Sequence, residues 1–259
     1  MTMIQPATHD AGLPDRWPIG PGVPPWPADG EVHVWSAALD EGDWAEAEGI
    51  LGSDEVAKAA AYRFAHDGAR FSRARILRRL VLARYLGCAA GDIAFGETGI
   101  RRPCLADREG ARVQGLDFNT SRSADMALIA VASGMRVGID IEVARVMDDI
   151  DEIARQHFHV NEWLAIAGER APAAKQNVFL RCWTRKEALT KAMGVGLHLP
   201  LHAFFVGTEP EAAPFRAFFD VDPSGQPGWW LTDLSVPPAY AALASDGVPK
   251  RLHLWRMRL

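Results

Sequence analysis

The most informative residues of this sequence are two acids, Asp140 and Glu142, in the otherwise apolar stretch 137–143. Alternate residues of a strand face the same side, so both acids would point away from Ile139 and Ile141. Neighbouring carboxylates repel each other and resist removal from water, and a divalent cation would relieve both costs. The pair therefore predicts a Mg²⁺ site, with Mn²⁺ as the alternative ion, because both ions prefer oxygen ligands. An exposed edge strand with two solvated acids is the competing interpretation.

A second group of charges lies about 45 residues further along, at Lys186, Glu187 and Lys191. Good helix formers from Phe179 onward and the glycine at 194 predict a helix that stops there. Lys186 falls within the apolar arc of this helix, where a lysine needs an anionic partner to keep its charge. Glu187 and Lys191 are four residues apart, so they form either an ordinary surface ion pair or part of a site for phosphate and metal.

Arginine is concentrated in residues 56–102, which hold ten Lys or Arg against three acids in a chain of net charge −5. A helix predicted over about 67–87 carries Arg75 and Arg78 within its apolar face. Either the aliphatic parts of these side chains pack on the core, or their guanidinium groups line a phosphate pocket. Guanidinium groups match the geometry of phosphate oxygens. A basic segment in an acidic protein favours a discrete anionic ligand over a long nucleic acid. Further arginines near this helix are Arg63, Arg70 and Arg102.

Composition excludes several classes of protein. The chain is 48% hydrophobic and 24% charged, which is typical of a globular protein. It contains no run of 18 apolar residues and begins without a signal-peptide pattern, so we expect a cytoplasmic protein that does not enter a membrane. The three cysteines lack metal-ligand spacing and are expected to be reduced thiols.

The elements predicted around the charged residues fall into two halves of similar order, each with a strand, helices and further strands. This order predicts an α+β fold of two similar α/β lobes related by a pseudo-two-fold, with the ligand site at the lobe interface. We expect a proline-rich N-terminal arm over residues 1–30, an N-terminal lobe over 31–115, and a C-terminal lobe with the metal site over 116–259. Residues 118–123 are predicted to run from a strand into a polar turn, and Gly134 to close a hairpin.

Three stretches together resemble one family in order and spacing. They are Phe-Asn-Thr-Ser-Arg-Ser at 118–123, Gly-Ile-Asp-Ile-Glu at 138–142, and Trp-Thr-Arg-Lys-Glu-Ala-Leu-Thr-Lys at 183–191. The combination resembles the 4′-phosphopantetheinyl transferases, in particular the larger, monomeric Sfp-type branch. The resemblance covers roughly residues 60–205 and leaves the proline-rich arm out.

The resemblance implies transfer of 4′-phosphopantetheine from coenzyme A to a serine of an apo acyl or peptidyl carrier protein, with release of adenosine 3′,5′-bisphosphate. It makes Asp140, Glu142 and Glu187 the Mg²⁺ ligands, and Glu187 also the base for the carrier serine. The implied catalytic residues are Asp140, Glu187 and Lys191. Lys191 would bind the pyrophosphate. Lys186 would face coenzyme A phosphates or brace the site. Ser121 and Arg122 would touch the nucleotide end. The candidates for the 3′-phosphate and adenine side are Arg63, Arg70 and Arg102.

One position departs from the family pattern. Arg122 stands where histidine is common, and arginine can still donate to phosphate but cannot titrate at neutral pH. Two other functions are weighed against the transferase. A different metal-dependent phosphotransferase or nucleotidyltransferase lacks support, because the sequence contains neither a phosphate-loop motif nor a kinase-type motif. A non-catalytic homologue that binds coenzyme A or a carrier protein is disfavoured by the intact acids. The identity of the carrier is not encoded in any motif.

Overall fold

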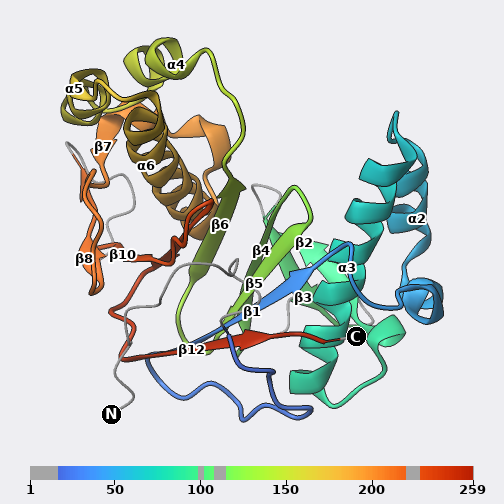
Figure 1. The fold of residues 1–259 in the computed structure, drawn as a ribbon. Helices are drawn as coiled ribbons and strands as arrows, with labels where there is room; N and C mark the ends of the chain where they lie inside the picture. Colours follow the sequence, from blue (N-terminus) through green and yellow to red (C-terminus); the bar gives the residue numbers. More distant parts are fainter. Residues whose placement is uncertain (1–16, 99–101, 108–114, 220–227, 259) are drawn as a thin grey trace.

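The computed structural model describes residues 17–98, 102–107, 115–219 and 228–258. Two four-stranded sheets lie at the centre of the molecule, and a 22-residue helix packs on the outer face of each (Figure 1). Apolar side chains of both sheets share a third cluster between them, which includes Val34, Leu128, Ile139 and Leu243. The fold is therefore α+β with two similar lobes, as predicted.

The first lobe is built on the sheet order β12-β1-β5-β4, in which β12 runs parallel to β1 and the other neighbours are antiparallel. Its covering helix α3 packs Ile76, Leu77 and Val81 against the sheet and ends at Gly87, whose φ of 63° suits glycine. The elements are β1 (Glu31–Ala38), η1 (Ala45–Ile50), α2 (Ser53–Ala60), α3 (Ala65–Leu86), η2 (Ala90–Asp92), β2 (Ala94–Glu97), β3 (Pro103–Ala106), β4 (Asp117–Ser123), β5 (Met126–Ala132) and β12 (Arg251–Arg256).

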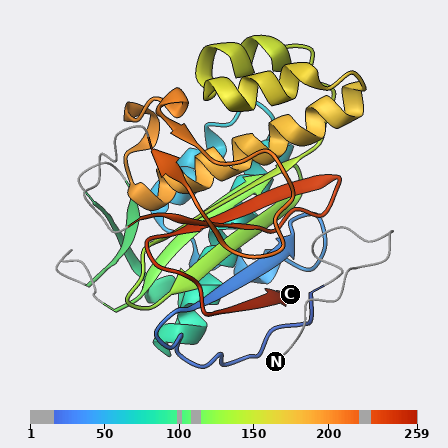
Figure 2. The ribbon, with the colours of Figure 1, turned by 90° about the vertical axis from the view of Figure 1, so that its left-hand side faces the viewer.

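The second lobe repeats this plan with the sheet order β6-β11-β10-β8 and the helix α6. Figure 2 shows α6 lying across the strands, with α4 and α5 beyond it. The elements are β6 (Val137–Val143), α4 (Ile150–His157), α5 (Val160–Gly168), α6 (Pro172–Met193), η3 (Gly196–His198), η4 (Leu201–Ala203), β7 (Phe204–Phe205), β8 (Phe215–Arg216), β9 (Phe218–Phe219), β10 (Trp230–Asp233) and β11 (Ala239–Ser245). The predicted end of α6 is confirmed at Gly194, which has a φ of 71°.

The lobes divide at a different place from the predicted boundary at 115/116. β4 and β5 complete the sheet of the first lobe, and β12 returns to that sheet from the end of the chain. The predicted hairpin at Gly134 is wrong, because β6 pairs with β11 and the chain crosses there into the second sheet. Strand partners that are distant in sequence therefore decide which lobe a strand belongs to.

The two sheets meet along β4 and β6, where side chains replace the usual backbone ladder. Asp117, Asn119, Ser121 and Ser123 accept hydrogen bonds from the backbone N–H groups of residues 137, 139, 141 and 143, at 2.9, 3.0, 3.4 and 3.1 Å. The polar residues at 121–123 thus belong to a strand and not to the predicted turn. This row of bonds fixes β6 in register beside β4.

Residues 17–30 of the predicted arm lie against the first lobe. Trp17 is buried in the cluster between the sheets, and Ile19 forms a β-bridge with Arg256. The indole N–H of Trp26 donates to the Ser133 hydroxyl at 3.2 Å. The first 16 residues of the arm lie outside the described residues. In the described part of the chain, no helix has the length and apolar character that crossing a membrane requires.

Candidate active site

The acids of the strand and the charges of the helix come together because α6 packs directly on β6. A Cβ atom at Gly138 would lie 2.1 Å from the carbonyl oxygen of Ala188 and 2.4 Å from the backbone nitrogen of Ala192. Only glycine permits this approach, since such distances are far inside van der Waals contact. The glycine of the 138–142 motif therefore lets the helix bring Glu187 and Lys191 to the strand.

Asp140 lies at the centre of the site. Its Oδ1 accepts hydrogen bonds from the Lys191 ammonium at 2.5 Å and the Ser121 hydroxyl at 2.8 Å. Its Oδ2 is buried and has no hydrogen-bond partner among the described residues. Burial raises the pKa of Asp140, and the bonds from Lys191 and Ser121 oppose that rise. A buried oxygen without a partner is costly, so this atom is available to a cation.

Glu142 and Glu187 add two more carboxylates beside Asp140. The Ser123 hydroxyl donates to Glu142 at 2.7 Å, so the serines at 121 and 123 each orient one acid. Burial is the main cause that raises the pKa of Glu142 and of Glu187, and repulsion from Asp140 raises both further. Three acids with one lysine leave an excess of negative charge that favours a cation.

A divalent cation fits this donor set. All three acids offer carboxylate oxygens, which Mg²⁺ and Mn²⁺ prefer, and the unpartnered Asp140 oxygen points to a missing positive charge. Within the described residues, the three carboxylates do not gather within 4.8 Å of one another. Glu142 and Glu187 would therefore turn toward Asp140 on binding the ion. Of the two interpretations of Glu187 and Lys191, a surface ion pair or part of a site, the structure favours the site, because Lys191 pairs with Asp140 of β6 at 2.5 Å.

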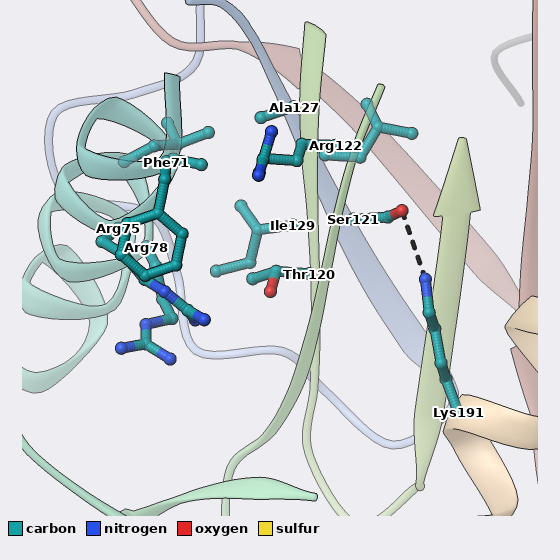
Figure 3. Close-up of a pocket in the computed structure, with 12 residues that line it drawn as sticks. Phe71, Arg75, Arg78, Thr120, Ser121, Arg122, Ala127, Ile129 and Lys191 are labelled. Carbon is teal, nitrogen blue, oxygen red and sulfur yellow. Dashed lines mark hydrogen bonds between the residues drawn. The ribbon is translucent and has the colours of Figure 1, made fainter. Parts of the chain in front are cut away.

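Two adjoining cavities of about 270 and 310 Å³ open beside Lys191, and Arg75, Thr120 and Lys191 line both. Figure 3 shows the first cavity, with the arginines of α3 on one side and Ser121 and Lys191 on the other. Arg78 forms a buried ion pair with Glu55 at 2.6 Å. Arg75 stacks on Phe71, and it has no carboxylate partner within 4.0 Å in the described part of the chain. These cavities are suited to a phosphorylated ligand.

The structure separates the arginines that were predicted to bind the nucleotide end. Arg122 lines the first cavity and donates to the Tyr62 hydroxyl at 3.0 Å. Arg63 is exposed beside its neighbour Phe64, and neither Arg63 nor Arg70 lines either of these two cavities. The sequence interpretation placed Arg122 at the nucleotide end and Arg63 and Arg70 on the 3′-phosphate and adenine side, and of these three the structure brings only Arg122 to the cavity.

Arg102 lines the second cavity but is already occupied. Its two terminal nitrogens bind the Asp117 carboxylate at 2.7 and 2.6 Å, one of them also reaches the Val137 carbonyl at 2.7 Å, and Nε donates to the Lys191 carbonyl at 3.2 Å. Every nitrogen of this side chain therefore has a partner. Arg102 thus connects β4, β6 and α6, the elements that carry the site residues.

Of the two roles expected for Lys186, facing coenzyme A phosphates or bracing the site, the structure favours the second. Its side chain is fully buried, forms an ion pair with Glu162 of α5 at 2.8 Å, and donates to the carbonyls of Leu201 and Phe204 at 2.7 Å each. Burial lowers the pKa of Lys186, and Glu162 opposes that effect. The lysine does have the anionic partner that its apolar surroundings demand, but the partner comes from α5. This ion pair fixes the position of α6, the helix that carries Glu187 and Lys191.

Sequence reasoning placed Arg75 only in part and did not single out two other features of the site. Arg75 was left between packing on the core and lining a phosphate pocket, and the structure brings it to both cavities. The alternation of polar residues at 117, 119, 121 and 123 marks the seam between the sheets, and could have indicated a strand. Nothing in the sequence marked Glu162 as the partner of Lys186, because the packing of α5 on α6 decides this pairing.

Comparisons with known proteins agree with this architecture. Residues 34–134 match the family model described as 4′-phosphopantetheinyl transferase, N-terminal, and residues 136–235 match the 4′-phosphopantetheinyl transferase superfamily model. The chain is 36% identical over 229 residues to 4′-phosphopantetheinyl transferase HetI of Nostoc sp., which covers 87% of this chain and 92% of that protein. The chain belongs to the 4′-phosphopantetheinyl transferase superfamily.

More distant members show the same relationship over shorter lengths. The chain is 35% identical over 91 residues to 4′-phosphopantetheinyl transferase gsp of Aneurinibacillus migulanus, covering 35% of this chain and 37% of that protein. It is 26% identical over 164 residues to the human L-aminoadipate-semialdehyde dehydrogenase-phosphopantetheinyl transferase, covering 61% and 53%. The two family models of this transferase divide at residue 135, where the chain crosses from the first sheet to the second.

Proposed function

We propose that this transferase moves the 4′-phosphopantetheine group of coenzyme A onto a serine of an apo acyl or peptidyl carrier protein. The reaction depends on Mg²⁺, or on Mn²⁺ in its place, and releases adenosine 3′,5′-bisphosphate. The observation that carries the proposal is the position of Asp140, Glu142, Glu187 and Lys191 at the junction of the lobes, beside cavities lined by arginine. Both lobes of one chain build this site, which supports action as a monomer.

The side chains have distinct tasks in this reaction. Arg75, Arg122 and Lys191 hold the phosphates of coenzyme A, with Ser121 keeping Lys191 and Asp140 in place. Asp140, Glu142 and Glu187 would hold a divalent ion, which would supply positive charge to the pyrophosphate oxygens. Phosphoryl transfer depends mainly on such alignment and charge neutralisation.

Glu187 takes the proton of the carrier serine, directly or through one water. The serine oxygen forms a bond to the phosphorus that carries pantetheine, and the bond from that phosphorus to the bridging oxygen breaks. The electron pair of the broken bond leaves on adenosine 3′,5′-bisphosphate, where Lys191 offsets the new charge. Without the ion, burial and repulsion from Asp140 raise the pKa of Glu187, and a bound cation would lower it again so that the carboxylate is ionised for this step.

The acceptor would approach from the side of Glu142. A cavity of about 570 Å³ opens there, with an apolar wall that includes Met147, Phe179 and Trp183. Val146 at its rim is 91% exposed. Such a surface suits the thin pantetheine arm and an apolar face of the carrier. No nucleic acid or membrane takes part in this reaction.

Mass spectrometry of apo carrier proteins incubated with this protein, coenzyme A and Mg²⁺ tests the proposal. Carriers of fatty-acid, polyketide and nonribosomal-peptide type are used together, with chromatography of the nucleotide products. The expected result is one added phosphopantetheine per carrier and one equivalent of adenosine 3′,5′-bisphosphate. Coenzyme A binding without either product would instead support a non-catalytic homologue.

A further inference from the structure

A second cluster of potential metal ligands lies on the sheet of the first lobe, separated from β4 by β5. Glu31 and His33 are two residues apart on β1 and share a face, and His253 lies opposite His33 in the parallel register with β12. The Glu31 carboxylate lies 4.0 Å from His33 Nε2 and 3.9 Å from His253 Nε2. One ligand atom from each residue falls within 4.8 Å of the other two.

His33 holds this cluster in a defined orientation. Its side chain is fully buried, and its Nδ1 is hydrogen bonded to the Tyr85 hydroxyl at 2.8 Å, which also accepts from the Trp35 indole at 2.9 Å. Its Nε2 has no hydrogen-bond partner among the described residues. A buried ring nitrogen without a partner is costly, while metal-ligating histidines commonly bond their second nitrogen to a polar group in this way.

We propose that Glu31, His33 and His253 form a binding site for a first-row transition-metal ion, in the first instance Zn²⁺. Two imidazoles and one carboxylate favour Zn²⁺ and its neighbours over Mg²⁺, which prefers oxygen ligands alone. The site is thus chemically distinct from the three acids at Asp140. The proposed zinc site has ligands on both β1 and β12, so a bound ion would link these two strands.

The geometry requires a small closure of the cluster. A tetrahedral Zn²⁺ ion holds neighbouring ligand atoms about 3.3 Å apart. The 4.0 and 3.9 Å separations are to different oxygens of Glu31, and one ligand atom from each residue lies within 4.8 Å of the other two, so these separations would shorten by up to roughly 1.5 Å. The side chains of His253 and Glu31 are 32% and 14% exposed, which leaves a path from solvent and room for water as the remaining ligand. Arg251, which contacts Glu31 at 3.0 Å, is 68% exposed and can turn away.

Calorimetric titration of the full chain with Zn²⁺, in excess Mg²⁺, tests the site. We expect one equivalent of Zn²⁺ to bind. His253→Ala should weaken binding by more than about tenfold, since even replacing the hydrogen-bond partner of a metal ligand typically costs about 10–100-fold in affinity. Glu31→Gln should have a similar effect while keeping the shape of the side chain. Zn²⁺ should raise the midpoint of thermal unfolding of the parent protein and not of these two variants.

Two control variants locate the bound ion. Asp140→Asn alters the acid site, and Cys88→Ser removes an exposed free thiol that could bind zinc by itself. Both should bind one equivalent of Zn²⁺ as the parent does. Unchanged binding by folded His253→Ala and Glu31→Gln, absence of Zn²⁺ binding, or loss of binding in either control variant would overturn the proposal. Circular dichroism confirms that each variant is folded.

Discussion

Replacing Lys186 by methionine should destabilise the protein without removing any ligand contact. The substitution deletes the partner of the buried Glu162 and leaves the carbonyls of Leu201 and Phe204 without their donor. Breaking a buried ion pair by removing one member costs about 3–5 kcal/mol. For a chain of this size, that loss lowers the midpoint of thermal unfolding by roughly 6–20 °C.

The unfolding free energy of Lys186→Met should be measured by urea denaturation, together with its affinity for coenzyme A below the unfolding transition. The double variant Lys186→Met/Glu162→Gln is the matched control, because it removes both charges and keeps an oxygen for the Val206 N–H, which bonds Glu162 at 2.8 Å. We expect the double variant to be less destabilised than the sum of the single variants.

The pH dependence of Lys186→Met provides a second measurement. Burial already raises the pKa of Glu162, and loss of Lys186 removes the largest opposing effect. A carboxyl group with a raised pKa binds more protons in the folded state, so stability is lost as the pH rises through that pKa. The deficit should be smaller at pH 5 than at pH 8. Unchanged stability together with weakened coenzyme A binding would refute the bracing role and restore the ligand role.

The remaining predictions concern the proposed reaction. Glu187→Gln should lower the rate of carrier modification by about 10²–10⁴-fold in a stopped-flow or mass-spectrometric assay, and a normal rate would remove Glu187 from catalysis. Arg75→Ala and Arg122→Ala should each weaken coenzyme A binding about tenfold or more by calorimetry, since a charge-assisted hydrogen bond contributes about 1.5–3 kcal/mol. Arg63→Ala serves as their control and should bind normally. The transfer rate should fall on acidification, because protonated Glu187 cannot accept the serine proton. A higher Mg²⁺ concentration should move this decrease to lower pH, since the ion competes with the proton for Glu187. A pH profile that does not respond to Mg²⁺ would contradict a site in which Glu187 binds the ion.

Local patterns in the sequence predicted the elements that carry the chemistry. Helix periodicity and the glycines at 87 and 194 located α3 and α6, because a left-handed cap depends only on neighbouring residues. The alternation in 137–143 correctly placed Ile139 in the core, since strand geometry alone sets which side a residue faces. The stretches at 118–123, 138–142 and 183–191 together carried the resemblance to the family.

Partners distant in the chain were decided only by the tertiary structure. The sequence showed that Lys186 needs an anionic partner, but it did not show whether that partner is a bound phosphate or an acidic residue. The packing of α5 brings Glu162 within 2.8 Å of the lysine. Arg102 was expected to bind phosphate, but the meeting of β4 and β6 places Asp117 and three carbonyls around it. Sequence thus determined which residues needed a charged partner, whereas the packing of separate elements determined which partner each one received.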